Sequence, residues 1–96
     1  MPWICVTPDH RLDSAQAGRL AGELAEAAAT VLGLTAQDVV VLVQGVDGSS
    51  GTGAVVGILG RDRGHLAEAA LRAAVTEVVA AGLGIPADLV GIARSS

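Results

Sequence analysis

The two halves of this chain repeat one pattern about fifty residues apart, and the repeat limits the fold more than any other feature. Each half reads as a strand, a helix and a second strand. The apolar positions of the first helix recur 51 residues later: Leu20, Leu24, Ala28 and Leu32 as Leu71, Val75, Val79 and Leu83. Two strands joined through a helix pair in parallel by a right-handed crossover. We therefore predict an α+β fold, a duplicated β-α-β unit with a four-stranded mixed sheet and both helices on one face.

Local signals give the expected elements. Apolar runs predict strands at residues 3–7, 39–43, 54–59 and 89–93, and helical periodicity predicts helices over about 14–32 and 65–81. Asp13 and Gln16 form a capping-box pattern before the first helix. The helices should bury Leu20, Leu24, Ala27 and Val31 in the first and Leu71, Val75, Val78 and Val79 in the second. We expect one domain, residues 1–96, with pseudo-repeats at about 2–45 and 54–94 and a frayed tail at 94–96.

Composition argues against several classes of function. The chain has 96 residues, a net charge of −4 and a single aromatic residue, Trp3, which disfavours nucleic-acid binding. Its one cysteine, Cys5, cannot form an intrachain disulfide and fits a reducing cytoplasm. The N-terminus lacks the basic and apolar regions of a signal peptide, and no apolar run reaches the roughly 20 residues of a membrane span. We expect a cytoplasmic protein without membrane or nucleic-acid partners.

Three further patterns have unremarkable interpretations. The Gly- and Ser-rich segment 45–53 lacks the Lys-Ser/Thr ending of a phosphate-binding loop, and we expect a flexible connection. His10 and His65 have no ligand spacing for a metal, so we expect surface histidines and no metal or cofactor. Cys5 is expected to be a packing residue.

The strand at residues 39–43 predicts assembly. Its sequence, VVVLV, does not alternate polar and apolar residues, so both of its faces favour burial. Two helices cover only one face of the predicted sheet, and their alanine-rich sequences make a thin core. The simplest cover for the second face is another copy of the chain.

The N-terminus offers a chemical group that no internal residue supplies. Pro2 directly follows the initiator Met1 and opens the first apolar strand. Removal of Met1 would leave a secondary amine, and an α-amino group ordinarily has a pKa of roughly 7.7–8.0. An apolar site near arginines would lower that pKa and give a base at neutral pH. If Met1 is retained, the Pro2 nitrogen is an amide and cannot be a base.

These features resemble the tautomerase superfamily, typified by 4-oxalocrotonate tautomerase and macrophage migration inhibitory factor. The resemblance rests on Met1-Pro2 opening a strand, the Gly-Leu-x-x-x-Asp-Val-x-Val segment from Gly33 to Val41, and the doubled unit, and it covers nearly the whole chain. It implies a trimer of doubled units in which the processed Pro2 is the catalytic base or acid. It also implies a small carboxylate-bearing substrate and no cofactor.

A narrower resemblance concerns malonate semialdehyde decarboxylase and the 3-chloroacrylic acid dehalogenases. Arg61 and Arg63 lie where those enzymes carry arginines that hold the substrate carboxylate, and Asp38 lies where the decarboxylase type has an acidic residue that works with the proline. Arg11 is close to the position of another arginine of the superfamily and is a candidate contact to a neighbouring subunit's site. The connecting loop and C-terminus are shorter here, and the chain has no Tyr or Phe for the pocket.

Each of these residues also has a structural interpretation. Arg61 and Arg63 fit a solvated turn, Arg11 a loop arginine beside Asp9 or Asp13, and Asp38 a cap, which its counterpart Asp88 favours. Trp3 fits either a pocket wall or a subunit contact.

The function predicted from the sequence is a cofactor-independent tautomerase with Pro2 as base after Met1 removal. Two alternatives remain. The first is a decarboxylase, hydratase or dehalogenase of a short three-carbon acid at the same site. The second is a non-catalytic, ferredoxin-like binding or assembly module with the same order of elements.

Overall fold

The computed structural model describes all 96 residues and confirms the doubled unit. The strands are β1 (Trp3–Pro8), β2 (Val40–Val43), β3 (Ala54–Leu59) and β4 (Val90–Ser95), and the helices are α1 (Ser14–Leu32) and α2 (His65–Leu83). Two short 3-10 helices, η1 (Ala36–Asp38) and η2 (Ala87–Leu89), precede β2 and β4 and were not predicted.

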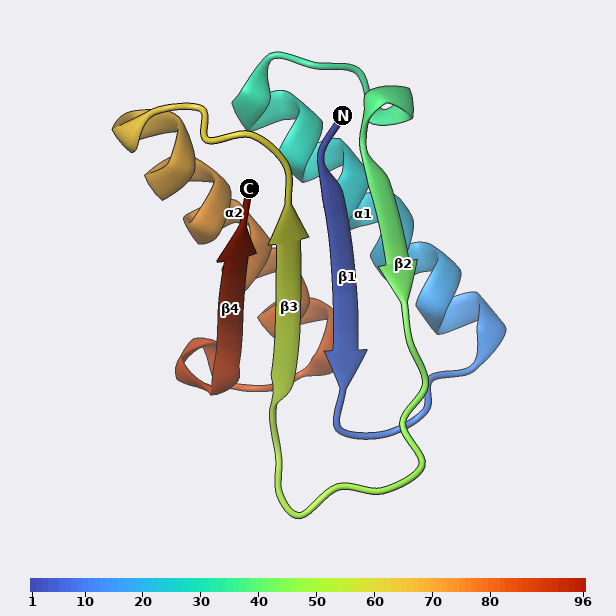
Figure 1. The fold of residues 1–96 in the computed structure, drawn as a ribbon. Coiled ribbons are helices and arrows are strands. Elements are labelled where there is room, and N and C mark those ends of the chain that lie inside the picture. The colour runs from blue at the N-terminus through green and yellow to red at the C-terminus, as the bar shows by residue number, and fades with distance from the viewer.

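The sheet has the predicted mixed topology. Its strand order is β2-β1-β3-β4, with β1 parallel to β2, β3 parallel to β4, and β1 antiparallel to β3 at the centre. Trp3 lies opposite Val40 on one side and opposite Leu59 on the other. Both helices lie on the same face of this sheet (Figure 1).

The helix ends follow local chemistry. The Asp13 carboxylate accepts a hydrogen bond of 2.8 Å from the Gln16 amide and caps α1, while the predicted return bond from the Gln16 side chain is not formed. Gly33 and Gly84 end the two helices with φ of 69° and 67°, a left-handed conformation that glycine adopts without steric cost. Helix α2 continues to Leu83, two residues beyond its predicted end, so Gly82 lies inside it.

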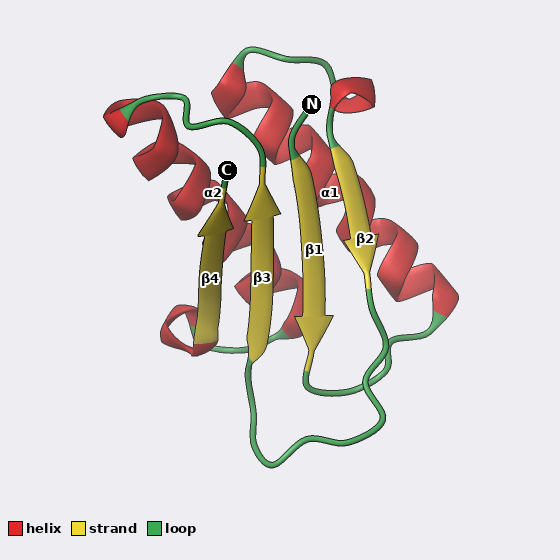
Figure 2. Cartoon of the chain, viewed as in Figure 1, coloured by secondary structure: helices red, strands yellow, loops and turns green.

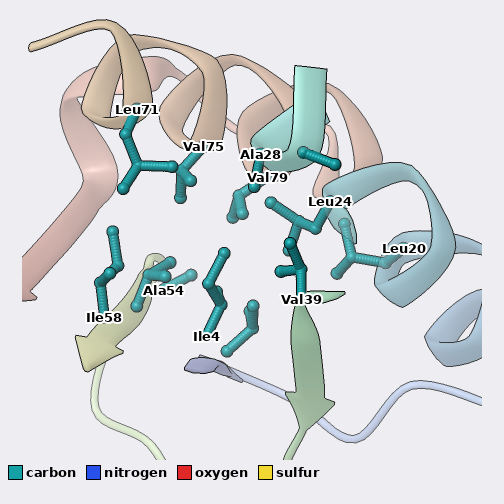
Figure 3. Close-up of a cluster of buried hydrophobic side chains, with 13 residues drawn as sticks. Ile4, Leu20, Leu24, Ala28, Val39, Ala54, Ile58, Leu71, Val75 and Val79 are labelled. Atoms are coloured by element: carbon teal, nitrogen blue, oxygen red, sulfur yellow. The ribbon is translucent and has the colours of Figure 1, made fainter. Parts of the chain in front are cut away.

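The core lies between the helices and the covered face of the sheet (Figure 3). Helix α1 buries Leu20, Leu24, Ala28 and Ala29, and helix α2 buries Leu71, Val75 and Val79. The predicted Ala27 and Val31 are only partly buried, because the buried stripe of α1 is centred one position further round the helix. Val78 is partly buried as well.

The other face of the sheet is uncovered and apolar, as predicted. Its large residues keep about half of their surface exposed: Trp3 46%, Leu42 53%, Val55 58% and Leu59 49%. Between them runs a row of small residues, Cys5, Gly57 and Ala93, which are neighbours across β1, β3 and β4. We refer to this surface as the open face.

The prediction of a frayed C-terminal tail was wrong. Strand β4 extends to Ser95, and Arg94 and Ser95 lie opposite Ile58 and Leu59 of β3. The Arg94 side chain lies on the helix-covered side, where it is only 16% exposed and bonded to an acidic side chain of α2. These bonds hold the end of the chain in the sheet.

The two halves also correspond outside the strands and helices. Gly53 precedes β3 as Pro2 precedes β1. The Gly53 amide donates a 2.8 Å hydrogen bond to the Asp9 carboxylate. This contact ties the long connection between β2 and β3 to the end of β1, at the sheet edge far from the N-terminus (Figure 2).

Candidate active site

Pro2 lies buried at the edge of the sheet where β1 begins. Its carbonyl accepts a 3.0 Å hydrogen bond from the Val40 amide, which extends the pairing of β1 with β2 by one residue. Met1 is 68% exposed. Pro2, whose nitrogen would become the free amine, is thus fixed in the fold. Met1, which must be removed, is exposed to solvent.

The connection from β3 to α2 begins directly against Pro2. A Cβ built on Gly60 would lie 3.4 Å from the Pro2 Cα, and Gly60 has a φ of 148°, which favours glycine. The N-terminus, the end of β4 and this connection lie together at one edge of the sheet (Figure 1). We call residues 60–64 the β3–α2 connection.

Arg61 and Arg63 lie on this connection, and neither forms a salt bridge. Arg61 is exposed and Arg63 is partly buried. Strand β3 ends at Leu59, as predicted, so the two arginines do not share one face of a strand. The structure therefore brings both arginines to the edge where Pro2 lies, on irregular backbone.

An ion pair behind this connection was missed by sequence reasoning. Arg94 Nε donates to Glu68 Oε1 at 2.7 Å and its Nη2 donates to Glu68 Oε2 at 3.1 Å, with both side chains 16% exposed. The Arg94 hydrogen bond is the main reason that the pKa of Glu68 is lowered, and the same bond raises the pKa of Arg94. The sequence held one signal: the two-residue period of β4 places Arg94 on the same face as Val90 and Ile92.

Asp38 lies on the other flank of the N-terminus. The Thr35 hydroxyl and amide donate hydrogen bonds of 2.8 and 3.2 Å to its carboxylate, which form a capping box. These two bonds lower the pKa of Asp38, and the positive charge of the N-terminus lowers it further. Asp38 is therefore a cap, as the structural interpretation predicted, and it is also close enough to interact with a charged N-terminus.

Trp3 lies on the open face beside the start of β1. It lines a shallow hollow of about 370 Å³ together with Leu42 and Leu59, above the small residues Cys5 and Gly57. The hollow is apolar and has no charged lining residue. Trp3 thus forms part of the wall of this hollow and is exposed on the face that a second subunit would cover.

Arg11 lies at the opposite edge of the sheet, beyond the end of β1. Its Nη2 is 3.4 Å from Asp47 Oδ1, and its guanidinium packs on Gly45. The expected partners Asp9 and Asp13 are not its partners. Six residues of strand, about 20 Å, separate this edge from Pro2, so Arg11 does not reach the Pro2 site of its own chain.

Neither histidine forms a hydrogen bond with Pro2, Arg61 or Arg63. His10 Nδ1 is 2.6 Å from Asp9 Oδ1 at the far edge, and His65 is exposed at the start of α2. No group of three His, Cys, Asp or Glu side chains is placed to hold a metal ion. No helix is both long and apolar enough to cross a membrane.

Solved structures share this fold, although no protein-family model and no curated protein matches the sequence. Macrophage migration inhibitory factor from Giardia lamblia matches with a TM-score of 0.83 and 18% identity, over 99% of this chain and 98% of that one. Q0 fused 4-OT, a symmetric trimer, matches at 0.83 and 21%, over 96% and 82%. Pt0534 inactivated by 2-oxo-3-pentynoate matches at 0.84 and 17%, over 98% and 83%. The predicted tautomerase-like fold is therefore confirmed.

Proposed function

We propose that this chain, which has the fold of the tautomerase superfamily, is a cofactor-independent tautomerase of a small carboxylated keto–enol substrate. The observation that carries the proposal is the environment of Pro2, buried against Gly60 while Met1 is exposed. Removal of Met1 converts the Pro2 nitrogen from an amide into a secondary amine. Such an amine can accept a proton from a carbon next to a carbonyl group.

Arg61 and Arg63 supply the substrate contacts in this proposal. Both guanidinium groups are free of salt bridges and can bind a carboxylate through paired hydrogen bonds. When the amine removes the proton, the electron pair of the C–H bond moves toward the carbonyl oxygen and forms an enolate. The nearby positive charges stabilise that enolate, and the ammonium then gives its proton to the enolate oxygen. Ketonisation of an enol runs the same steps in reverse: the amine takes the proton of the enol O–H, and the ammonium delivers it to the carbon.

A homotrimer is the assembly that we propose. The exposed apolar residues of the open face favour burial against further copies, and fused 4-OT of the same fold is a symmetric trimer. In such an assembly Arg11, far from its own chain's Pro2, is available to a neighbouring subunit's site.

The first experiment labels the amine. Intact mass shows whether Met1 is lost. 2-Oxo-3-pentynoate, which inactivated Pt0534, then tests the nitrogen: the amine adds to the alkyne and its proton moves to the adjacent carbon, so the protein gains the mass of one whole reagent. The matched control is the same chain with an N-terminal tag left in place, in which the Pro2 nitrogen is an amide.

The second experiment measures turnover. We expect wild type to ketonise phenylenolpyruvate or 2-hydroxymuconate, and Pro2→Ala to be slower by roughly 100-fold or more because it lacks the secondary amine. Equal rates in wild type, Pro2→Ala and the tagged chain would refute the tautomerase. Absence of both labelling and turnover would favour the non-catalytic assembly module.

Asp38 favours a second candidate function. The Asp38 carboxylate lies on the flank of the N-terminus, bonded to Thr35, and a nearby negative charge favours the protonated form of an amine. A protonated Pro2 would act as an acid, as hydration, dehalogenation or decarboxylation of a three-carbon acid requires. The pH at which the amine becomes reactive toward 2-oxo-3-pentynoate separates the two: a midpoint near or below 7 supports the base, and one near 9 supports the acid.

A further inference from the structure

The guanidinium of Arg94 is bonded to Glu68 and to four backbone carbonyls, two of which belong to the β3–α2 connection. Besides Glu68, it donates to the carbonyl oxygens of Gly60 at 2.8 Å and Arg61 at 2.9 Å. The carbonyls of Ile58, at 3.4 Å, and of Ser95 complete its partners. A guanidinium has five N–H groups in a fixed plane, and the geometry here gives each of them an acceptor.

Glu68 completes the arrangement from the helix side. Its Oε2 accepts a 3.2 Å hydrogen bond from the Arg63 amide as well as the bond from Arg94. The β3–α2 connection is therefore held at Gly60, Arg61 and Arg63 by one ion pair. Asp62 adds a local turn by accepting from the Gly64 amide at 2.8 Å.

Arg94 itself is poorly suited to bind a substrate. Its donors are occupied, its charge is matched by Glu68, and its side chain is 16% exposed. Arg61 and Arg63 have the opposite properties, since their charges are unpaired and their backbone is fixed. The backbone of the two unpaired arginines is thus bonded to Arg94 and Glu68, whose charges are already paired with each other.

We propose that Arg94 is the positioning residue of this site: its planar contacts with Glu68 and with the Gly60 and Arg61 carbonyls hold Arg61 and Arg63 beside Pro2. The role rests on the proposed function, because it concerns the carboxylate-binding arginines of that reaction. Independently of the chemistry, Arg94 and Glu68 hold the β3–α2 connection more firmly than the local Asp62–Gly64 turn does alone.

The test compares Arg94→Lys with Arg19→Lys. Lysine keeps the charge but has three donors on one nitrogen, so it cannot span Glu68 and two carbonyls together. Arg19 is exposed on α1 and is the matched control. Glu68→Gln is a second, milder variant in case Arg94→Lys folds poorly.

The chemical readout is a preference ratio. Alkylation of the N-terminal amine is measured with 2-oxo-3-pentynoate and with 3-pentyn-2-one, which has the same alkynyl ketone but a methyl group in place of the carboxylate. In wild type, Arg61 and Arg63 should bind the carboxylate and so make alkylation by the anionic reagent faster than alkylation by the ketone. Misplacement of the arginines should reduce this preference about tenfold in Arg94→Lys, with the ketone rate and the Arg19→Lys ratio unchanged.

A double-mutant cycle identifies the route of the effect. Arg61→Ala and Arg63→Ala are each measured in wild type and in Arg94→Lys. If Arg94 acts through them, at least one of the two substitutions must lower the ratio by a smaller factor in the Arg94→Lys background. Fully additive effects of both, or an unchanged ratio in Arg94→Lys, would overturn the positioning role.

Hydrogen exchange separates failure of this proposal from failure of the proposed function. Arg94→Lys should speed amide exchange in residues 60–64 about tenfold or more, while exchange in α1 stays unchanged. Unchanged exchange in residues 60–64 would refute the claim that Arg94 orders the connection, whatever the alkylation rates show. A wild type with no preference for the carboxylate refutes the proposed substrate class, and exchange alone then decides whether Arg94 orders the connection.

Discussion

Gly60 lies directly against Pro2: a Cβ on Gly60 would be 3.4 Å from the Pro2 Cα and 3.9 Å from its Cβ. Gly60 also has a φ of 148°, in a region that residues with a side chain rarely adopt. The residue that opens the β3–α2 connection therefore also forms one wall of the Pro2 position. No other glycine of the chain makes this contact.

Gly60→Ala should damage both stability and the site. We expect a loss of about 1–3 kcal/mol in the free energy of unfolding from the strained backbone, and slower labelling of the Pro2 amine. Gly22→Ala is the control, because Gly22 lies inside α1 with open space around it and should gain about 0.5–1 kcal/mol. Urea unfolding checks both values. Destabilisation of the two variants by equal amounts would contradict the role of the Gly60 backbone.

Glu68→Gln should remove a pH-dependent part of the stability. The pKa of Glu68 is lowered in the folded protein, chiefly by Arg94, so its contribution is present above the ordinary pKa of 4.5 and is lost as pH falls through the lower, folded value. We expect wild type to be more stable than Glu68→Gln by roughly 1–3 kcal/mol at pH 7, and the difference to shrink toward pH 3.

Urea midpoints at a fixed protein concentration measure this difference, because assembly makes apparent stability concentration-dependent. A difference that stays constant between pH 7 and pH 3 would show that Glu68 acts by packing and not by charge.

Leu42→Lys should disrupt assembly. Leu42 is 53% exposed at the centre of β2 on the open face, and a lysine there would carry charge into any contact that covers the sheet. Leu66→Lys is the control, since Leu66 is 83% exposed at the start of α2, away from the open face. Light scattering at micromolar concentration should show a smaller particle for Leu42→Lys alone. A monomeric wild type would remove the basis for the trimer.

Asp38→Asn should make Pro2 reactive at lower pH. Loss of a negative charge on the flank of the N-terminus disfavours a protonated amine there, so labelling at pH 6 to 7 should be faster than in wild type. Asparagine can still accept the Thr35 bonds that cap η1. Asp88→Asn, the matching change before β4, should leave the profile in place. Identical profiles for Asp38→Asn and wild type would exclude coupling between Asp38 and the amine.

The repeat made most of the fold predictable. The same apolar periodicity occurs in both halves of the chain, so the assignment of each half supported that of the other. Leu24 and Val75 were placed in the core by this one argument. The helix ends were also predictable from sequence, because Asp13 and Gly33 cap α1 through bonds to residues only a few positions away.

The site was less predictable because its contacts are not local. Arg94 and Glu68 are 26 residues apart, and most partners of Arg94 are backbone carbonyls, which no sequence pattern marks. A charged residue at a chain end suggested fraying, although the alternation of β4 placed it inward. Arg11 was near Pro2 in sequence, yet the extended strand β1 carries it to the opposite edge.

The correspondence between Gly53 and Pro2 has a consequence for the number of reactive amines in an assembly. In the second half, the place that corresponds to Pro2 holds an internal peptide nitrogen, and its hydrogen is already donated to a carboxylate. The two halves therefore place corresponding residues before β1 and before β3, but only Pro2 can become an amine. A ring of these chains would bear one reactive nitrogen per subunit, so complete labelling should saturate at one reagent for every chain.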